Sequence, residues 1–371
     1  MKAALMPTGW IDLSQALGTI VADAGVTELA RQARVMRAIG SPFVADVLAA
    51  ADRHLHHAPL TWAIMADWPG DPAAAALAMR LNAALHALAR RDTPASLGAL
   101  YRSEHDDVDG AVRAALVAHD DVVAAWLREA PQTNEVGRTA AILAALTEVM
   151  RQAALPVELI ELGASAGLNL NLAHYRYDLG GVAFGPAESA VRIAPAWRGA
   201  APSADHAVTV VAAEGVDLQP LDAHDPATCE RLMAYVFADQ PARSARLGEA
   251  LAIARRHPPR LMRADATAWL AERLVQPQPA GRWRVIFHSM MAQYVGTAQR
   301  ALLDQVIARA GERAASACPL ARIAFEWNAD RSAVELCVTT WPGGATRVLA
   351  TCHPYGAWIE WHARPTMFSE A

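Results

Sequence analysis

The spacing of hydrophobic positions divides the chain near residue 155, and the first part has the spacing of helices. Asp71-Pro72 is a candidate helix start, because Asp caps free backbone N–H groups and Pro suits the first turn. Beyond it, leucines recur at helical spacing along what should be one buried face: Leu77, Leu81, Leu85 and Leu88. We therefore expect residues 1–154 to form an all-helical N-terminal domain.

The last helix of this part is expected over residues 139–154. Its apolar face carries Ile142, Leu146 and Val149, and Pro156 ends the pattern. Just before it, Asn134 is a natural N-cap and Glu135 suits the positive end of a helix. A cation in the first turn opposes the helix dipole, so we expect Arg138 to face the site and contact an acidic group of the substrate.

After residue 155, short runs rich in Val and Ile alternate with helical stretches, which predicts an α/β fold with a mostly parallel sheet covered by helices. The candidate strands are residues 157–162, 208–213, 260–263, 284–288, 321–327, 334–340 and 347–351. The last three are not separated by long helices, so an antiparallel end to the sheet is expected. An insertion near 174–205 contains Gly180-Gly181 and Pro195 among scattered apolar residues, a pattern closer to a small β-hairpin than to a helix.

Composition narrows the class of protein. A chain of 371 residues, 53% hydrophobic and 19% charged, suits a globular protein with two domains or one enlarged one. The net charge of -5 disfavours a nucleic acid partner, because binding to a phosphate backbone needs a basic face. The four cysteines form no C-x-x-C pair, so we predict no metal site and no disulfides, and expect a cytoplasmic protein. No apolar run reaches the roughly 18 residues of a membrane span.

The stretch VELIELGASAGLNLNL predicts a buried strand, a glycine-rich turn and the start of a helix. Glu161 closes the strand, Gly163, Ser165 and Gly167 lie in the turn, and Asn169 is either a ligand contact or a helix cap. The turn resembles the nucleotide-binding loop of an S-adenosylmethionine-dependent methyltransferase, in which the helix N-terminus would favour an anionic group. The letters G-A-S-A-G also resemble the nucleophile elbow of an α/β-hydrolase.

Later strand ends extend the resemblance to methyltransferases. G-V-D-L-Q-P resembles their second strand end, which makes Asp217 the expected acceptor for the ribose hydroxyls. R-A-D-A resembles the next one, where Asp265 would accept from the adenine amino group, and Ser289 follows the strand after that. Over residues 155–371 the resemblance implies a Rossmann-like domain with a seven-stranded sheet and S-adenosylmethionine as cofactor. Both aspartates have an alternative role as helix N-caps.

The pattern departs from that of methyltransferases at two points. The middle glycine of the loop is replaced by Ser165, which adds a Cβ and a hydroxyl near the ligand. Asp217 follows Glu161 by 56 residues, whereas about 20 is usual for a simple βαβ unit. The hairpin-like insertion has to account for the extra length.

The remaining candidates concern the substrate. His288 follows a buried strand at the edge where α/β sites form, so it is a candidate general base, with a structural histidine as the alternative. Tyr294 is the second catalytic candidate, and Gln293 beside it would orient the substrate. Tyr175 and Arg176, just beyond the glycine-rich turn, are expected to close over the substrate, with surface packing as the alternative.

A narrower resemblance covers nearly the whole chain. It is carried by Q-T-N-E-V-G-R from residue 132, E-L-G-A-S-A-G-L-N-L from 161, Y-R-Y from 175, G-V-D-L-Q-P-L-D from 215, and F-H-S from 287 with Gln293-Tyr294. These motifs are similar to those of a bacterial family catalogued only as a domain of unknown function. The resemblance implies a helical N-terminal region joined to a methyltransferase-like α/β region.

We therefore expect a methyltransferase that uses S-adenosylmethionine on a small molecule, without a membrane or nucleic acid partner. One alternative is a non-catalytic relative that binds a nucleotide or a protein partner. The other is a serine hydrolase with Ser165 as nucleophile, Asp265 or Asp330 as acid and His353 as base. A hydrolase needs a sheet already under way before the elbow, whereas the preceding residues have a helical pattern. The oligomeric state stays open.

Overall fold

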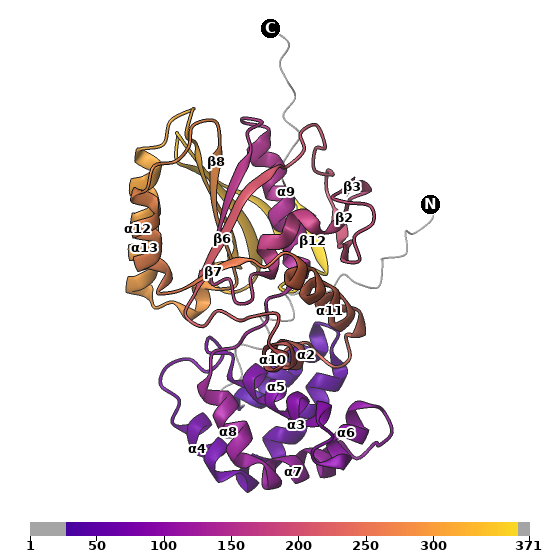
Figure 1. The fold of residues 1–371 in the computed structure, drawn as a ribbon. Helices are drawn as coiled ribbons and strands as arrows, with labels where there is room; N and C mark the ends of the chain where they lie inside the picture. The colour runs from indigo at the N-terminus through magenta and orange to yellow at the C-terminus, as the bar shows by residue number, and fades with distance from the viewer. Residues whose placement is uncertain (1–26, 363–371) are drawn as a thin grey trace, which may run out of the picture. The chain divides into compact units, whose positions relative to one another are not determined.

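The computed structural model describes residues 27–362, which divide into two compact units. The helical unit comprises residues 27–133 and 224–247, and the sheet unit comprises residues 134–223 and 248–362 (Figure 1). The division falls within one helix, α11 (Pro241–Arg256). The helical unit is thus built from two separate stretches of the chain, and the helix expected over 139–154 belongs to the sheet unit.

The helical unit consists of short helices joined by tight turns. In chain order these are α2 (Glu28–Ala38), α3 (Pro42–His54), the 3₁₀ turn η1 (Leu55–His57), α4 (Pro59–Ala66), α5 (Leu77–Arg90), α6 (Ala95–Tyr101), α7 (Val108–Ala118), α8 (Asp120–Arg128), α10 (Pro226–Ala234) and the first part of α11. The predicted leucine stripe lies on α5, and all four leucines are buried. Asp71 and Pro72 do not begin that helix: they lie in a turn that precedes it.

Helix α10 packs against α5 although 135 residues lie between the end of α5 and the start of α10. Asp225 caps α10 by accepting from two backbone amides, and Pro226 occupies its first turn. Arg90 of α5 pairs with Glu230 of α10 at 2.9 Å, and His86 Nδ1 lies 3.1 Å from the carbonyl oxygen of Ala234. The second stretch of the chain therefore contributes to the core of the helical unit.

The sheet unit contains a nine-stranded mixed sheet. Its strands are β1 (Val157–Leu162), β5 (Ala196–Arg198), β6 (Val210–Asp217), β7 (Arg260–Arg263), β8 (Trp283–Ser289), β9 (Leu320–Trp327), β10 (Val334–Trp341), β11 (Ala345–Cys352) and β12 (Trp358–Trp361), in the order β5-β12-β11-β10-β9-β8-β1-β6-β7. All seven predicted strands occur, although β6 begins and ends later than expected. The α/β fold is confirmed, but the sheet has nine strands rather than seven.

The sheet is parallel at one end and antiparallel at the other. Strands β7, β6, β1, β8 and β9 run parallel, whereas β10, β11 and β12 follow each other as an antiparallel meander. The two strands that the sequence pattern missed are short, and they pair with each other at the far edge, β5 with β12. Their lengths of three and four residues leave little periodicity to detect.

The insertion between β1 and β6 forms a small sheet of its own. Strands β2 (Arg176–Leu179) and β3 (Val182–Phe184) make the expected antiparallel hairpin, and β4 (Arg192–Ile193) pairs with β2 in parallel. Gly180 and Gly181 form the turn with positive φ angles, which glycine adopts at little cost. The insertion is therefore more than a hairpin, because its end continues into β5 of the main sheet.

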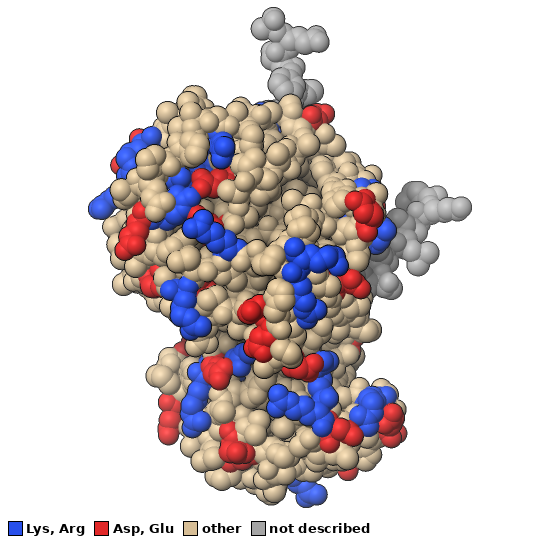
Figure 2. All heavy atoms as spheres, in the orientation of Figure 1, with Lys and Arg blue, Asp and Glu red and all other residues tan. Residues whose placement is uncertain are grey.

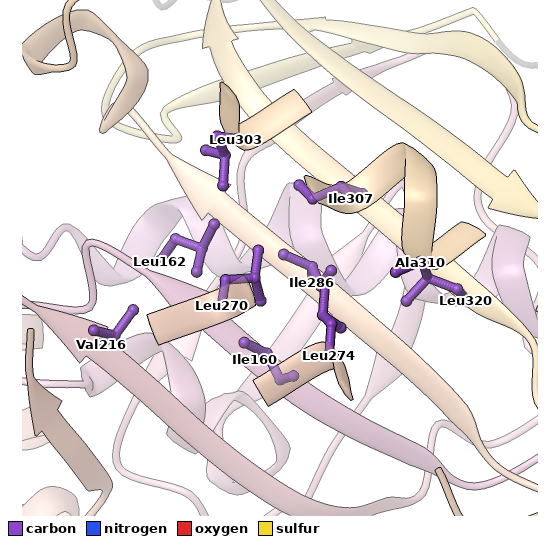
Figure 3. Close-up of a cluster of buried hydrophobic side chains, with 10 residues drawn as sticks. All are labelled: Ile160, Leu162, Val216, Leu270, Leu274, Ile286, Leu303, Ile307, Ala310 and Leu320. Carbon is purple, nitrogen blue, oxygen red and sulfur yellow. The ribbon is translucent and has the colours of Figure 1, made fainter. Parts of the chain in front are cut away.

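Helices cover both faces of the main sheet (Figure 1). On one face, α12 (Ala266–Val275) and α13 (Thr297–Glu312) bury a cluster with strand residues, among them Ile160, Leu162 and Ile286 (Figure 3). On the other face lies α9 (Thr139–Met150), whose residues are all buried. Because side chains alternate along a strand, Glu161 faces the α9 side and His288 faces the α12 and α13 side.

The visible surface carries both signs of charge. Figure 2 shows Lys and Arg interspersed with Asp and Glu over the face in view, without a large patch of one sign among the described residues. None of the helices within residues 27–362 combines the length and the apolar character needed to cross a membrane.

Candidate functional site

Three neighbouring parallel strands end at the same level. The register aligns Leu162 of β1 with Val216 of β6 and His288 of β8. The residues that follow them are three of the predicted cofactor contacts: Gly163, Asp217 and Ser289. The chain goes from β1 to β6 and β7 on one side and returns to β8 on the other, so the ends of β1 and β8 form a topological switch point. Ligands of α/β proteins bind at such points.

The glycine-rich turn after β1 has a left-handed backbone at alternate residues. The angle φ is +70° at Gly163, +55° at Ser165 and +67° at Gly167. Such a conformation costs a residue with a side chain about 1–2 kcal/mol and costs glycine little. Ser165 therefore adopts the tight turn in place of the usual glycine, with backbone strain of the kind that accumulates at functional sites.

Asp217, the predicted ribose acceptor, binds the turn. Its Oδ2 accepts from the backbone N–H of Ser165 at 2.8 Å, and its Oδ1 accepts from that of Gln219 at 2.8 Å. The side chain is partly buried at the end of β6. Each carboxylate oxygen has a second lone pair, so these bonds leave acceptor capacity for a ligand hydroxyl.

Asn134 binds the same turn from the far side of the sequence. Its Oδ1 accepts from the amides of Ala166 and Leu168 at 3.2 and 3.1 Å. The expected N-cap role of Asn134 for the helix over 139–150 is therefore wrong. Together with the bond from the amide of Ser165 to Asp217, these contacts engage three backbone amides in and after the turn. These amides are therefore not free to bind an anionic group of a ligand, contrary to the role expected from the sequence.

The segment after the turn is a buried 3₁₀ helix, η3 (Leu168–His174), and not the expected α-helix. The hydroxyl of Tyr175 donates to the carbonyl of Leu168 at 2.5 Å, and that of Tyr177 donates to the carbonyl of Leu172 at 2.9 Å. Tyr175, predicted to close over the substrate, is thus fully buried and braces the turn.

Three polar atoms in this region are buried without a hydrogen-bond partner among residues 27–362. They are Oε2 of Glu161, Oγ of Ser165 and Oδ1 of Asn169, three of nine such atoms in that range. The other oxygen of Glu161 accepts from Asn169 Nδ2 at 3.1 Å. Glu161 is 1% exposed, and burial raises its pKa well above the usual 4.5. Because buried polar atoms are normally paired, the cluster points to a missing polar group.

Arg138 lies close to this cluster and is 5% exposed. It follows Glu135, whose carboxylate accepts from the amide of Gly137 in the 3₁₀ turn η2 (Val136–Arg138). Its Nε donates to the carbonyl of Pro354 at 2.9 Å, and its Nη1 donates to that of Ser289 at 3.4 Å. Arg138 therefore joins the end of β8 to the loop after β11.

A short segment after β8 lies over the turn. A Cβ added to Gly163 would lie 2.5 Å from Cγ of Met291, so this methionine packs directly on the glycine. Glu326 Oε1, on β9, accepts from the amides of Met291 and Ala292 at 3.0 and 3.2 Å. The same segment carries the predicted substrate residues Gln293, which donates to the carbonyl of Met290, and Tyr294, which is 45% exposed.

His288, the candidate general base, is 1% exposed and has partners at both ring nitrogens. Its Nδ1 lies 2.7 Å from Glu326 Oε1, and its Nε2 lies 3.1 and 3.2 Å from two nitrogens of Arg322. Nδ1 therefore donates to the carboxylate and Nε2 accepts from the guanidinium, which is the neutral tautomer. To act as a base, His288 would have to break its hydrogen bond with Arg322. The geometry supports a structural role instead, in which His288 holds the carboxylate of Glu326 in place.

Two other predicted contacts lie away from the turn. Asp265 is exposed and caps α12 by accepting from the amide of Ala268 at 2.9 Å, which is the alternative role considered for it. Arg176 lies in the small sheet, where it donates to the carbonyl of Gly185 at 3.0 Å. Neither has a hydrogen bond to the glycine-rich turn among the described residues.

The geometry gives Ser165 no hydrolase partners within residues 27–362. Its hydroxyl has no hydrogen bond, whereas a serine nucleophile needs a base within reach. His353 Nδ1 instead accepts from the amide of Tyr355, and Asp330 binds Ser332 in an exposed turn.

Two cavities occur in the helical unit. One of about 560 Å³ lies between α2 and α3 and is lined largely by alanines and by Arg34, Arg37 and Arg53. The other, of about 340 Å³, is lined by residues of α5, α8 and α10, including Trp126 and Arg231. Neither contains a residue of the glycine-rich turn, where Met291 occupies the space over Gly163. Met291 therefore limits how closely a ligand can approach Gly163.

Three residues that build this edge were not predicted from the sequence in these roles. Glu326 is the last residue but one of β9, beside β8, and an acid near a strand's carboxyl end was a signal that could have identified it. Asn134 binds an amide 32 residues away in the sequence, and the carbonyl of Pro354 binds Arg138, 216 residues away. Sequence spacing gives no signal for either contact.

The chain was also compared with known proteins. No curated protein and no solved structure matches it. A family model described as an uncharacterized protein conserved in bacteria, DUF2332, matches residues 26–361, which is nearly the whole of the described chain. The motifs around the glycine-rich turn, Arg138 and the end of β8 all lie within that match. The chain therefore belongs to this bacterial family, DUF2332.

Proposed function

We propose that the chain is an S-adenosylmethionine-dependent methyltransferase acting on a small molecule. The observation that carries the proposal is the group of three unpartnered polar atoms on Glu161, Ser165 and Asn169, beside a strained turn at the switch point of parallel strands. Buried acceptors without donors are expensive, so a ligand that supplies donors would stabilise them.

The arrangement of strands supports the same class of enzyme. The five parallel strands have the spatial order β7-β6-β1-β8-β9, which is third, second, first, fourth and fifth in their own chain order. A doubly wound nucleotide-binding sheet has this order around its switch point. The antiparallel strand β10 follows directly after β9, so the methyltransferase-type assignment concerns the parallel part of the sheet.

The residues at the turn fit the polar groups of the cofactor. An amino group, such as that of the methionine part, could donate to Oε2 of Glu161 and Oδ1 of Asn169. A positive charge there would also favour the ionised form of Glu161, whose pKa burial raises. Asp217 retains lone pairs for ribose hydroxyls, although both of its oxygens accept backbone N–H groups.

The cofactor would supply an electrophilic methyl group, and the chain's contribution is to hold and orient the reactants. Holding a nucleophile in line with the methyl group accounts for a large part of the rate in such reactions. Tyr294 and Gln293, on the segment above the turn, are the side chains that would contact the substrate. His288 would act at a distance, by fixing Glu326 and through it the backbone of Met291.

Calorimetric titration with S-adenosylmethionine and S-adenosylhomocysteine tests the proposal. The matched variants are Asn169→Ala and Asn171→Ala, since both asparagines are buried in η3 but Asn171 donates to the carbonyl of His257 and not to Glu161. We expect the first to weaken binding about tenfold or more, the value of one or two hydrogen bonds to a polar ligand, and the second to have little effect.

The other outcomes separate the alternative functions. Absence of heat with either nucleoside, in wild-type protein shown to be folded, would contradict the proposal. Binding without methyl transfer across a broad panel of small molecules would favour a non-catalytic nucleotide-binding protein. Covalent labelling of Ser165 by a fluorophosphonate probe would favour the serine hydrolase instead.

A further inference from the structure

Arg138 is a buried cation that forms no ion pair with the described residues. Within residues 27–362, no Asp or Glu lies within ion-pair distance of its guanidinium, and its only hydrogen bonds go to the backbone carbonyls of Pro354 and Ser289. A guanidinium has five N–H donors, so these two bonds leave three donors unused. A side chain that is 5% exposed has little water to satisfy them.

Holding the two loops does not explain the positive charge. A neutral side-chain amide could donate to a backbone carbonyl oxygen equally well. Removing a full positive charge from water only to make such bonds is costly. Two other arginines of the sheet unit are paired: Arg284, which is buried, and Arg273, which is partly buried, both bind Glu158. Arg138 has no such ion pair, so its guanidinium retains the capacity to bind an anionic group of a ligand.

The surroundings of Arg138 also favour an anion. The residue forms the N-cap position of α9, and the positive end of a helix favours negative charge. Burial lowers the pKa of the Arg138 guanidinium, and the charges of Glu135 and Glu326 oppose this effect without forming an ion pair with it; a directly bound anion would oppose it further. The charge of Arg138 also lowers the pKa of Glu161, so the two buried side chains are close enough to interact electrostatically.

We propose that Arg138 binds a carboxylate group of the ligand at the ends of β1 and β8. The planar fork of a guanidinium matches a carboxylate, and the unused N–H groups on Nη1 and Nη2 form one side of that fork. The inference deepens the proposed function and rests on it for the identity of the ligand. The carboxylate belongs either to the amino-acid part of the cofactor or to the substrate, and the recognising chemistry is the same.

The test compares wild type with Arg138→Gln, Arg138→Lys and the control Arg192→Gln. Arg192 is an exposed arginine of the same unit that donates to the carbonyl of Ala187, so its replacement removes one charge away from the turn. Arg138→Lys keeps the charge but not the fork, and it provides a second variant if Arg138→Gln does not fold. Folding of each is checked by thermal unfolding.

The first arm measures calorimetric affinities for S-adenosylhomocysteine, which has the carboxylate, and for 5′-methylthioadenosine, which lacks it. If Arg138 binds the cofactor, Arg138→Gln weakens the affinity for S-adenosylhomocysteine about tenfold to a hundredfold and leaves the affinity for 5′-methylthioadenosine unchanged. The second arm measures thermal stabilisation by acetate, succinate and benzoate against equal concentrations of chloride. If Arg138 binds the substrate, Arg138→Gln and Arg138→Lys lose this stabilisation while the affinity for S-adenosylhomocysteine stays the same.

The two proposals fail in different ways. If wild type binds neither nucleoside, the cofactor assignment falls, and the second arm still decides whether Arg138 binds a carboxylate. If Arg138→Gln is folded and matches wild type and Arg192→Gln in both arms, the carboxylate proposal is overturned whatever the cofactor does.

Discussion

Replacement of Asn134 by alanine should loosen the glycine-rich turn. The side chain accepts two buried amides, from Ala166 and Leu168, at 3.2 and 3.1 Å. Loss of its acceptor costs each buried N–H about 1–2 kcal/mol, so for the two amides we expect a total loss of about 2–4 kcal/mol. Asn134 also has φ of +35°, a conformation that alanine tolerates less well than asparagine.

Two further variants separate the hydrogen bonds from the backbone strain. Asn134→Asp keeps an acceptor oxygen and the tolerance for positive φ, and Asn134→Gly keeps only the backbone freedom. Hydrogen exchange measures the local opening of the turn directly, which matters because a chain with two compact units need not unfold in one step. The amides of Ala166 and Leu168 should exchange about 30-fold to 1,000-fold faster in Asn134→Ala and Asn134→Gly than in Asn134→Asp. Equal protection in all three variants would refute the reasoning.

Three other substitutions follow from the structure. Glu161→Gln should stabilise the protein relative to wild type, and increasingly so as pH rises above 4.5, because the raised pKa of the buried carboxyl means that folding of wild type takes up a proton there. The same substitution should weaken cofactor binding. A stability that depends on pH in the same way in wild type and Glu161→Gln would contradict this reasoning. Burial lowers the pKa of His86 from 6.5 to about 4, so the stability that its neutral form contributes is complete above pH 6.5 and is lost as pH falls toward 4. Chemical denaturation of His86→Phe between these pH values should show a flatter profile than wild type, and an unchanged slope would argue against the assignment. Gly356→Ala should lower the melting temperature, because φ of +71° alone costs about 1–2 kcal/mol and the new Cβ would lie 2.4 Å from backbone atoms of Gly137. A melting temperature equal to that of wild type would show that the backbone shifts easily to relieve this close contact.

Local patterns predicted much of the fold. The leucine stripe of α5 and the apolar runs of β1 and β8 give strong signals, because one pattern persists over several residues. The short strands β5 and β12 gave no such signal, and they are held by pairing with each other. Secondary structure was therefore predicted well where a segment's own sequence determines it. It was predicted poorly where pairing with a distant segment determines it.

The same distinction applies to the site. The common position of Glu161, Gly163 and Asp217 at one edge was predictable because each lies at or directly after the end of a strand, and the register brings these strand ends together. The roles of Asn134 and Glu326 depend on tertiary contacts across more than 30 residues. Sequence spacing alone cannot distinguish a carboxamide that caps the next helix from one that reaches a turn elsewhere.

The division of the helical unit between two stretches of chain has a consequence for its biosynthesis. Residues 224–247, with α10 packed on α5, are translated only after β1 and β6 of the sheet unit. The helical unit therefore cannot complete its core while the ribosome is still making the first half of the chain, and the usual order in which an N-terminal domain folds first does not apply. A fragment that ends at residue 133 would lack the partner of Arg90 and expose the face of α5 that α10 covers. The helical unit thus needs both of its stretches of chain before its core is complete.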